Sequence, residues 1–187
     1  MKSLHLTRPH AIMMVGIPGS GKSFFAKQFS DMFSAPYVDS LVIEERSIDS
    51  ARAGELIALL LGEIAKTGQT FIFEGNSDSR VRRTEFARWA RERGYQPMFV
   101  WVQADKATSL SRTLKSKSLN RDEFEDIVHK FSAPHPDEKP VVISGKHTYA
   151  SQAKVILSHL SKENRPIEIS KAPERTASGG ARAITVR

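Results

Sequence analysis

A lysine and a serine follow a glycine-rich stretch near the start of the chain, in the order Gly16-Ile17-Pro18-Gly19-Ser20-Gly21-Lys22-Ser23. Glycines let the backbone turn tightly, so that successive amide N–H groups point at one anion. A helix expected to begin near Gly21 adds its positive end at the same place. The Lys22 ammonium can bridge the β- and γ-phosphates of a nucleoside triphosphate, and the Ser23 hydroxyl can ligate Mg²⁺.

The surroundings of this stretch support a phosphate-binding loop. It matches the pattern G-x-x-x-x-G-K-[ST], which chance alone would produce in on the order of one per cent of chains of this length. An apolar run at residues 10–16 precedes it and an amphipathic pattern at residues 22–33 follows, as a strand and a helix would. We therefore predict ATP and Mg²⁺ as ligands. The expected nucleotide contacts are Gly16, Pro18, Gly19, Ser20, Gly21, Lys22 and Ser23.

The rest of the sequence alternates β-type runs with helical patterns. Strands are predicted at residues 10–16, 35–39, 69–73, 95–103 and 141–144, and helices at residues 22–33, about 49–67, 80–93, 106–115, 122–131 and 149–160. This alternation predicts an α/β fold, with a mainly parallel five-stranded sheet covered by helices on both faces. Ligands bind such sheets at the carboxyl ends of the strands.

The order of several segments resembles the P-loop kinases grouped with polynucleotide 5′-hydroxyl kinases, within the broader AAA-type ATP-binding proteins. The loop is followed by Tyr37-Val38-Asp39, then by a strand ending in Glu74-Gly75-Asn76, and then by Arg112. The resemblance covers about residues 12–160 and implies a three-layer αβα P-loop fold. It also implies that Glu74 helps to position the metal, although Glu stands where the family usually has Asp.

Asp39 falls where the resemblance places a carboxylate that accepts the proton of the attacking hydroxyl. A carboxylate at the end of a strand and facing the γ-phosphate can orient and deprotonate an acceptor. The alternative is a turn residue or a helix N-cap, because Asp is common in both roles. The family usually carries an arginine three residues further on, where this chain has Val42.

Arg112 falls where the resemblance places a lid arginine. A planar guanidinium can bind the γ-phosphate through two hydrogen bonds and neutralise charge during transfer. Lys115 and Lys117 continue into a polar stretch that is typical of a short mobile lid, or of an ordinary solvated helix face.

Six arginines crowd the helix predicted at residues 80–93. They present either a basic surface for an anionic acceptor or an ordinary polar face that Glu85, Glu92 and solvent accommodate. The six are Arg80, Arg82, Arg83, Arg88, Arg91 and Arg93.

Composition limits the remaining choices. The chain has 187 residues, which suits one globular domain, and its net charge is +7. Residues 161–187 hold six Lys/Arg and three Asp/Glu, or +3, which leaves +4 for the rest. We assign residues 1–160 to one ATP-binding domain and residues 161–187 to a flexible basic tail. With no cysteine, no secretory signal at the start and no apolar run long enough to span a bilayer, a cytoplasmic protein is expected.

Three functions remain open from sequence alone. The leading one is a kinase that moves the γ-phosphate of ATP onto a hydroxyl group. Its favoured acceptor is a nucleoside, nucleotide or nucleic-acid 5′-hydroxyl, and a small metabolite comes second. The second is a regulatory ATPase or nucleotide-binding module without an acceptor. The third is a nucleic-acid-binding protein that uses the arginine helix and the tail.

Overall fold

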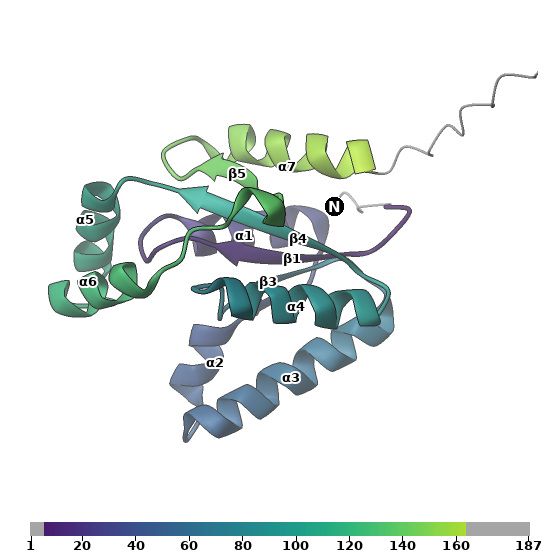
Figure 1. Ribbon diagram of the computed structural model, residues 1–187, viewed down its shortest axis with the longest axis horizontal. Helices are drawn as coiled ribbons and strands as arrows, with labels where there is room; N and C mark the ends of the chain where they lie inside the picture. Colours follow the sequence, from purple (N-terminus) through teal and green to yellow (C-terminus); the bar gives the residue numbers. More distant parts are fainter. Residues whose placement is uncertain (1–5, 164–187) are drawn as a thin grey trace, which may run out of the picture.

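A five-stranded parallel sheet between two layers of helices forms the protein in the computed structural model, which describes residues 6–163 (Figure 1). The strand order is β2-β3-β1-β4-β5, and every neighbouring pair is parallel. The strands are β1 (His10–Val15), β2 (Tyr37–Asp39), β3 (Phe71–Glu74), β4 (Gln96–Gln103) and β5 (Val141–Ser144). The predicted three-layer α/β fold is therefore confirmed.

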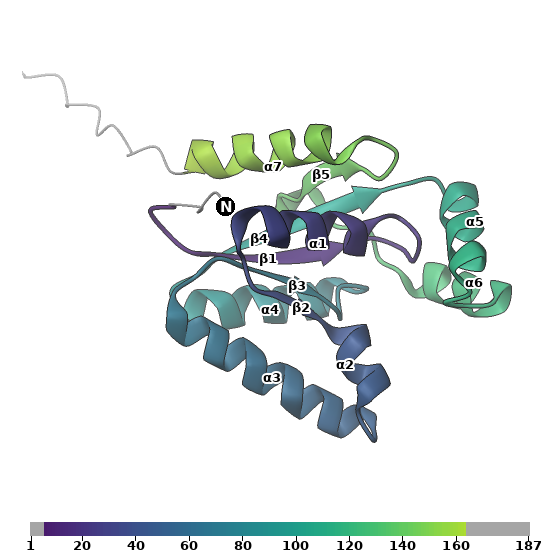
Figure 2. The same ribbon diagram turned by 180° about the vertical axis from the view of Figure 1, so that it is seen from behind.

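The helices cover both faces of the sheet and one of its ends. α1 (Lys22–Phe33) and α7 (Tyr149–Glu163) pack on one face, and α3 (Ser50–Thr67) and α4 (Arg80–Glu92) pack on the other. α5 (Lys106–Ser116) and α6 (Arg121–Lys130) form a pair beyond the carboxyl ends of the strands (Figures 1 and 2). The short α2 (Ser40–Arg46) and the 3-10 turn η1 (Pro136–Glu138) complete the described elements.

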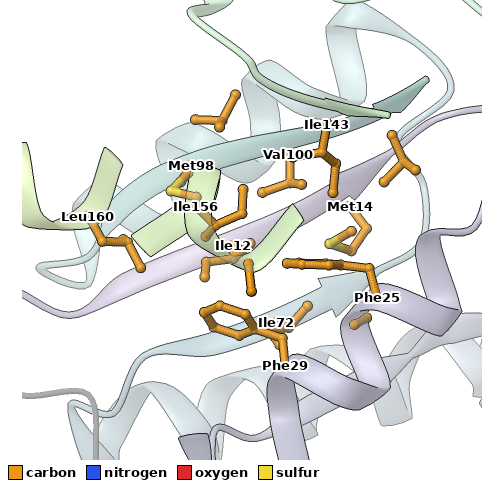
Figure 3. Close-up of a cluster of buried hydrophobic side chains, with 14 of the residues drawn as sticks. Ile12, Met14, Phe25, Phe29, Ile72, Met98, Val100, Ile143, Ile156 and Leu160 are labelled. Atoms are coloured by element: carbon orange, nitrogen blue, oxygen red, sulfur yellow. The ribbon is translucent and has the colours of Figure 1, made fainter. Parts of the chain in front are cut away.

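Two apolar cores fix the central strand. All six residues of β1 are buried, and their side chains alternate between the two faces of the sheet. Ile12 and Met14 join the core beneath α1 and α7, where they lie close to Phe25 and Phe29 (Figure 3). The odd-numbered residues of β1 enter the core beneath α3 and α4. Because β1 is held from both sides, the loop that leaves its carboxyl end begins from a rigid base.

The helix limits largely agree with the sequence patterns. Asp49 caps α3 through the amide of Arg52, and Gly68 ends that helix in a left-handed conformation. The helix α2 was not predicted, because its seven residues are too few to show a clear period. α7 continues to Glu163, beyond the predicted boundary at residue 160. The tail predicted from there lies outside the described residues, apart from its first three.

Arg83 corrects the prediction that the arginines of α4 form a solvated or ligand-facing surface. Its side chain is fully buried, and the guanidinium donates two hydrogen bonds to the Glu138 carboxylate, at 2.7 and 3.0 Å. It also donates to the carbonyl oxygens of Ser77 and Ser132, both at 2.9 Å. Arg83 therefore joins the start of α4 to the segment that leads from α6 to β5.

Within residues 6–163, no helix has the length and hydrophobicity needed to cross a membrane.

Replacing Arg83 tests whether this buried ion pair stabilises the fold. Arg83→Met should lower the free energy of unfolding by about 3–5 kcal/mol, because the Glu138 carboxylate would stay buried without its partner. Arg88→Met, at an exposed position of the same helix, should change it by less than about 0.5 kcal/mol. Urea denaturation of both variants measures the difference. Equal stability of the two variants would contradict the assigned role of Arg83.

Candidate functional site: a phosphate-binding loop and a pair of carboxylates

Residues 16–21 form the turn between β1 and α1, and Lys22 and Ser23 begin α1, so the glycine-rich stretch joins a strand to a helix as the sequence predicted. The turn packs closely against α5: a Cβ built on Gly19 would lie 2.2 Å from the carbonyl oxygen of Ser109. The backbone of Gly19 has φ of 71°, which side chains rarely adopt. Only glycine therefore fits at position 19, both for its conformation and for the space left by α5.

Lys22 lies at the inner side of this loop with its side chain only 15% exposed. Its Nζ donates a hydrogen bond to the carbonyl oxygen of Ile17 at 3.1 Å and lies 4.0 Å from Oε1 of Glu74. Burial lowers the pKa of the Lys22 ammonium below its ordinary value, and the carboxylates of Glu74 and Asp39 oppose that shift. A bound polyphosphate would supply further negative charge and favour the protonated form.

Glu74 and Ser23 contact each other directly; the loop pattern predicted Ser23, and the resemblance Glu74, as residues near the metal. The Ser23 hydroxyl donates to Oε1 of Glu74 at 2.9 Å, and Glu74 is only 5% exposed at the end of β3. A serine hydroxyl and a carboxylate are the hard oxygen ligands that Mg²⁺ prefers. These two residues therefore have the chemistry to hold Mg²⁺ directly or through its water shell, beside the phosphates that the loop would bind.

Tyr37 connects the two carboxylates of the site and was not predicted as a site residue. Its hydroxyl lies 2.7 Å from Oε2 of Glu74 and 3.1 Å from Oδ2 of Asp39, and donates toward both. Burial and the two neighbouring carboxylates raise the pKa of Tyr37 well above its ordinary value, so the phenol stays protonated. Asp39 and Glu74 are in register on β2 and β3, and this pairing brings Tyr37 within reach of Glu74.

Asp39 takes the position of a helix N-cap as well as that of a site carboxylate. Its Oδ1 accepts a hydrogen bond from the amide of Leu41 at 3.2 Å, at the start of α2. Its Oδ2 accepts from Tyr37. The two roles weighed from sequence are therefore compatible, because the cap fixes the direction in which the carboxylate points.

Arg112 reaches the loop from α5. Its Nη1 donates to the carbonyl oxygen of Gly145 at 3.0 Å and lies 3.5 Å from that of Gly19. An ion pair between Lys146 and Asp105 joins the same two segments, the β5–α7 connection and the start of α5. The guanidinium and the Lys22 ammonium therefore both lie against the loop backbone, an arrangement that fits a polyphosphate.

The other predicted cations lie farther from the loop contacts. Lys115 and Lys117 are exposed at the end of α5. Arg80 lies 3.7 Å from Asp137, and Arg82 donates to Oδ1 of Asn76 at 2.7 Å. Asn76 follows Glu74 closely, so Arg82 joins α4 to the β3 end of the site, beside the Ser77 carbonyl that Arg83 contacts.

A hollow of about 760 Å³ opens beside the loop, at the carboxyl ends of β4 and β5. Of the loop residues, only Ile17 lines it. Its apolar wall includes Trp101, Phe131 and Val142, and Lys146 and His147 border it from the β5–α7 connection. Trp101 thus faces this hollow from β4, in addition to packing against the core.

The sheet order and the glycine-rich loop after the central strand define the three-layer fold of P-loop NTPases. The chain belongs to the AAA domain family, whose sequence profile matches residues 12–131. The match to this family confirms the broader part of the resemblance, and the finer likeness to polynucleotide 5′-hydroxyl kinases stays a prediction.

Solved structures share the fold at low sequence identity. A gluconokinase from Sinorhizobium meliloti 1021 is 13% identical with a TM-score of 0.63, over 83% of this chain and 94% of that one. The Mycobacterium tuberculosis APS kinase CysC, in complex with AMPPNP and APS, is 18% identical with a TM-score of 0.62, over 82% and 98%. Chaetomium thermophilum Kti12, in complex with ADP-AlF3, is 13% identical with a TM-score of 0.65, over 81% and 97%. Among curated proteins, no sequence matches this chain.

Two glycines with nearly the same backbone conformation test the fit of the loop against α5. Gly68 has φ of 67° and open space around it, so Gly68→Ala should cost only about 1–2 kcal/mol of stability for its left-handed conformation. Gly19→Ala carries the same conformational cost and also displaces α5. It should therefore be less stable in urea than Gly68→Ala and lose ATP affinity. If the two variants match in stability and in ATP affinity, the close packing of Gly19 against α5 contributes to neither property.

Proposed function

We propose that this protein is an ATP-dependent kinase that transfers the γ-phosphate to a hydroxyl group. The observation that carries the proposal is that two carboxylates, joined by the Tyr37 hydroxyl, have different hydrogen-bond partners. Glu74 pairs with Ser23 of the loop, on the side where Mg²⁺ would bind. Asp39 lies on the other side of Tyr37 and is not hydrogen-bonded to Ser23. Its two oxygens accept only from Leu41 and Tyr37, so each keeps a lone pair for an acceptor proton.

The transfer would use these residues in fixed roles. Asp39 accepts the proton of the acceptor hydroxyl while the oxygen of that hydroxyl bonds to the γ-phosphorus. At the same time, the bond between the γ-phosphorus and the β–γ bridging oxygen breaks. Lys22 and Arg112 neutralise the charge that moves to the β-phosphate. Mg²⁺, held by Ser23 and Glu74, would screen the repulsion between the phosphates. Tyr37 keeps both carboxylates in place and transfers no proton itself, because its pKa is raised.

A small-molecule acceptor is the better supported class. The gluconokinase and the APS kinase share the fold, and their names describe small substrates. Position 42, where the polynucleotide kinases usually have an arginine, holds Val42, and Arg46 donates to the backbone of its own helix at the Val42 carbonyl. Val42 has no group that could bind an acceptor phosphate, and Arg46 is directed toward its own helix, so the arginine contact of that family lacks its counterpart at position 42.

A panel of acceptors tests the proposal. The protein is incubated with ATP and Mg²⁺ and with sugars, sugar acids, nucleosides, a 5′-hydroxyl oligonucleotide and adenosine 5′-phosphosulfate, and phosphorus NMR follows transfer. At least one hydroxyl acceptor should gain phosphate faster than ATP is hydrolysed. ATP hydrolysis that no member of the panel redirects would overturn the kinase and favour the regulatory ATPase.

Two aspartates that cap helices provide a matched pair of variants for the same assay. Asp39→Asn and Asp49→Asn both keep a good N-cap, because Asn caps helices as well as Asp does. Asp39→Asn should lower kcat about 10²- to 10⁴-fold with little change in ATP affinity, since it removes the base. Asp49→Asn should leave kcat unchanged. Full activity of Asp39→Asn would exclude Asp39 as the base.

A further inference from the structure

Three leucines on α3 face outward although the opposite flank of the helix already fills the core. Ala53, Ile57 and Leu61 are buried against the sheet. Leu56, Leu59 and Leu60 are 46%, 59% and 43% exposed. α3 lies at the lower boundary of the fold in both views, and no other described element runs along its outer side (Figures 1 and 2). A continuous exposed apolar patch of this kind marks an interaction surface.

Two of the three exposed leucines belong to a regular seam. Residues spaced alternately by three and four positions lie on one stripe of a helix and form the contact line of a coiled coil. One stripe on α3 and its N-cap has this spacing. It contains Leu56 and Leu59 at its centre and charged residues toward both ends. Its members are Asp49, Arg52, Leu56, Leu59, Glu63 and Lys66. Leu60 flanks the stripe on the side toward the core.

We propose that this seam binds the same seam of a second copy of the chain, with the two α3 helices antiparallel about a two-fold axis. The axis passes between Leu56 and Leu59. Leu56 then packs against the partner's Leu59, and the reverse contact follows by symmetry. Arg52 faces the partner's Glu63, and Asp49 faces the partner's Lys66.

The distribution of charge favours a second copy over other occupants. In the antiparallel arrangement of two identical chains, each charged member of the seam meets an opposite charge. A parallel pair would place Arg52 on Arg52 and Glu63 on Glu63, which is unfavourable. Within one chain Lys66 donates to Glu63 at 2.6 Å, and both side chains are mostly exposed, so this local pair is weak and leaves both free to contact a partner.

The size of the seam sets the expected strength of the dimer. α3 has 18 residues and about 27 Å of length, and it contributes one flank. One flank of a single helix of this length buries less surface than the roughly 800 Å² per partner of a standard stable interface. The dimer should therefore be in exchange with the monomer and depend on protein concentration.

Charge-swap variants test this arrangement by sedimentation velocity over a range of protein concentrations. The wild type should shift from monomer toward dimer as concentration rises. Arg52→Glu and Glu63→Arg should each weaken self-association about tenfold or more, because each places two like-charged pairs across the axis. Combining both substitutions in one chain should restore the dimer. An equimolar mixture of the two single variants should form the heterodimer.

Two controls separate loss of the seam from loss of the fold. Val81→Gln removes an exposed apolar side chain from α4, away from the seam, and should dimerise as the wild type does. Thermal unfolding of each variant checks that it is folded. A wild type that stays monomeric at its highest soluble concentration would overturn the proposal. So would single variants that associate like the wild type, or a mixture that forms no heterodimer.

Discussion

The buried carboxylate of Glu74 is the contact on which the organisation of the site depends. It lies at the end of β3, next to the central strand, and accepts from Ser23 on one oxygen and from Tyr37 on the other. Lys22 lies within 4.0 Å of it. A carboxylate at this depth is stable only with several donors and a cation around it. The same contacts therefore stabilise the charge and align the phosphate-binding loop with the end of β2.

The sequence was sufficient for the parts of the molecule that local patterns determine. The loop at residues 16–23 and the limits of α1 agree with the structure, because the glycines and the helical spacing act over short stretches. Tyr37 was missed because its partner Glu74 is 37 positions away and becomes a neighbour only when β2 pairs with β3. Arg83 was missed for a similar reason: Glu138 and Ser132 surround it only after the segment beyond α6 folds back onto α4.

Different elements hold the two carboxylates of the candidate site. The glycine-rich loop joins β1 to α1, and Lys22 begins α1. Glu74 ends β3, whereas Asp39 ends β2 and caps the short helix α2, which leads into α3. Under the proposed function, changes in these two helices would alter the acceptor without altering the contacts of the nucleotide. Val42, at the position where the polynucleotide kinases usually have an arginine, lies on α2.

The central claim is that residues 16–23 and Lys22 bind the phosphates of ATP together with Mg²⁺. Isothermal titration of ATP into the wild type, Lys22→Ala and Lys27→Ala, with and without Mg²⁺, tests it most directly, since Lys27 is an exposed lysine on the same helix. Magnesium-dependent binding is expected for the wild type and Lys27→Ala, with affinity about 10- to 100-fold weaker for Lys22→Ala. No magnesium-dependent binding by the wild type, or equal affinity for Lys22→Ala, would contradict the account.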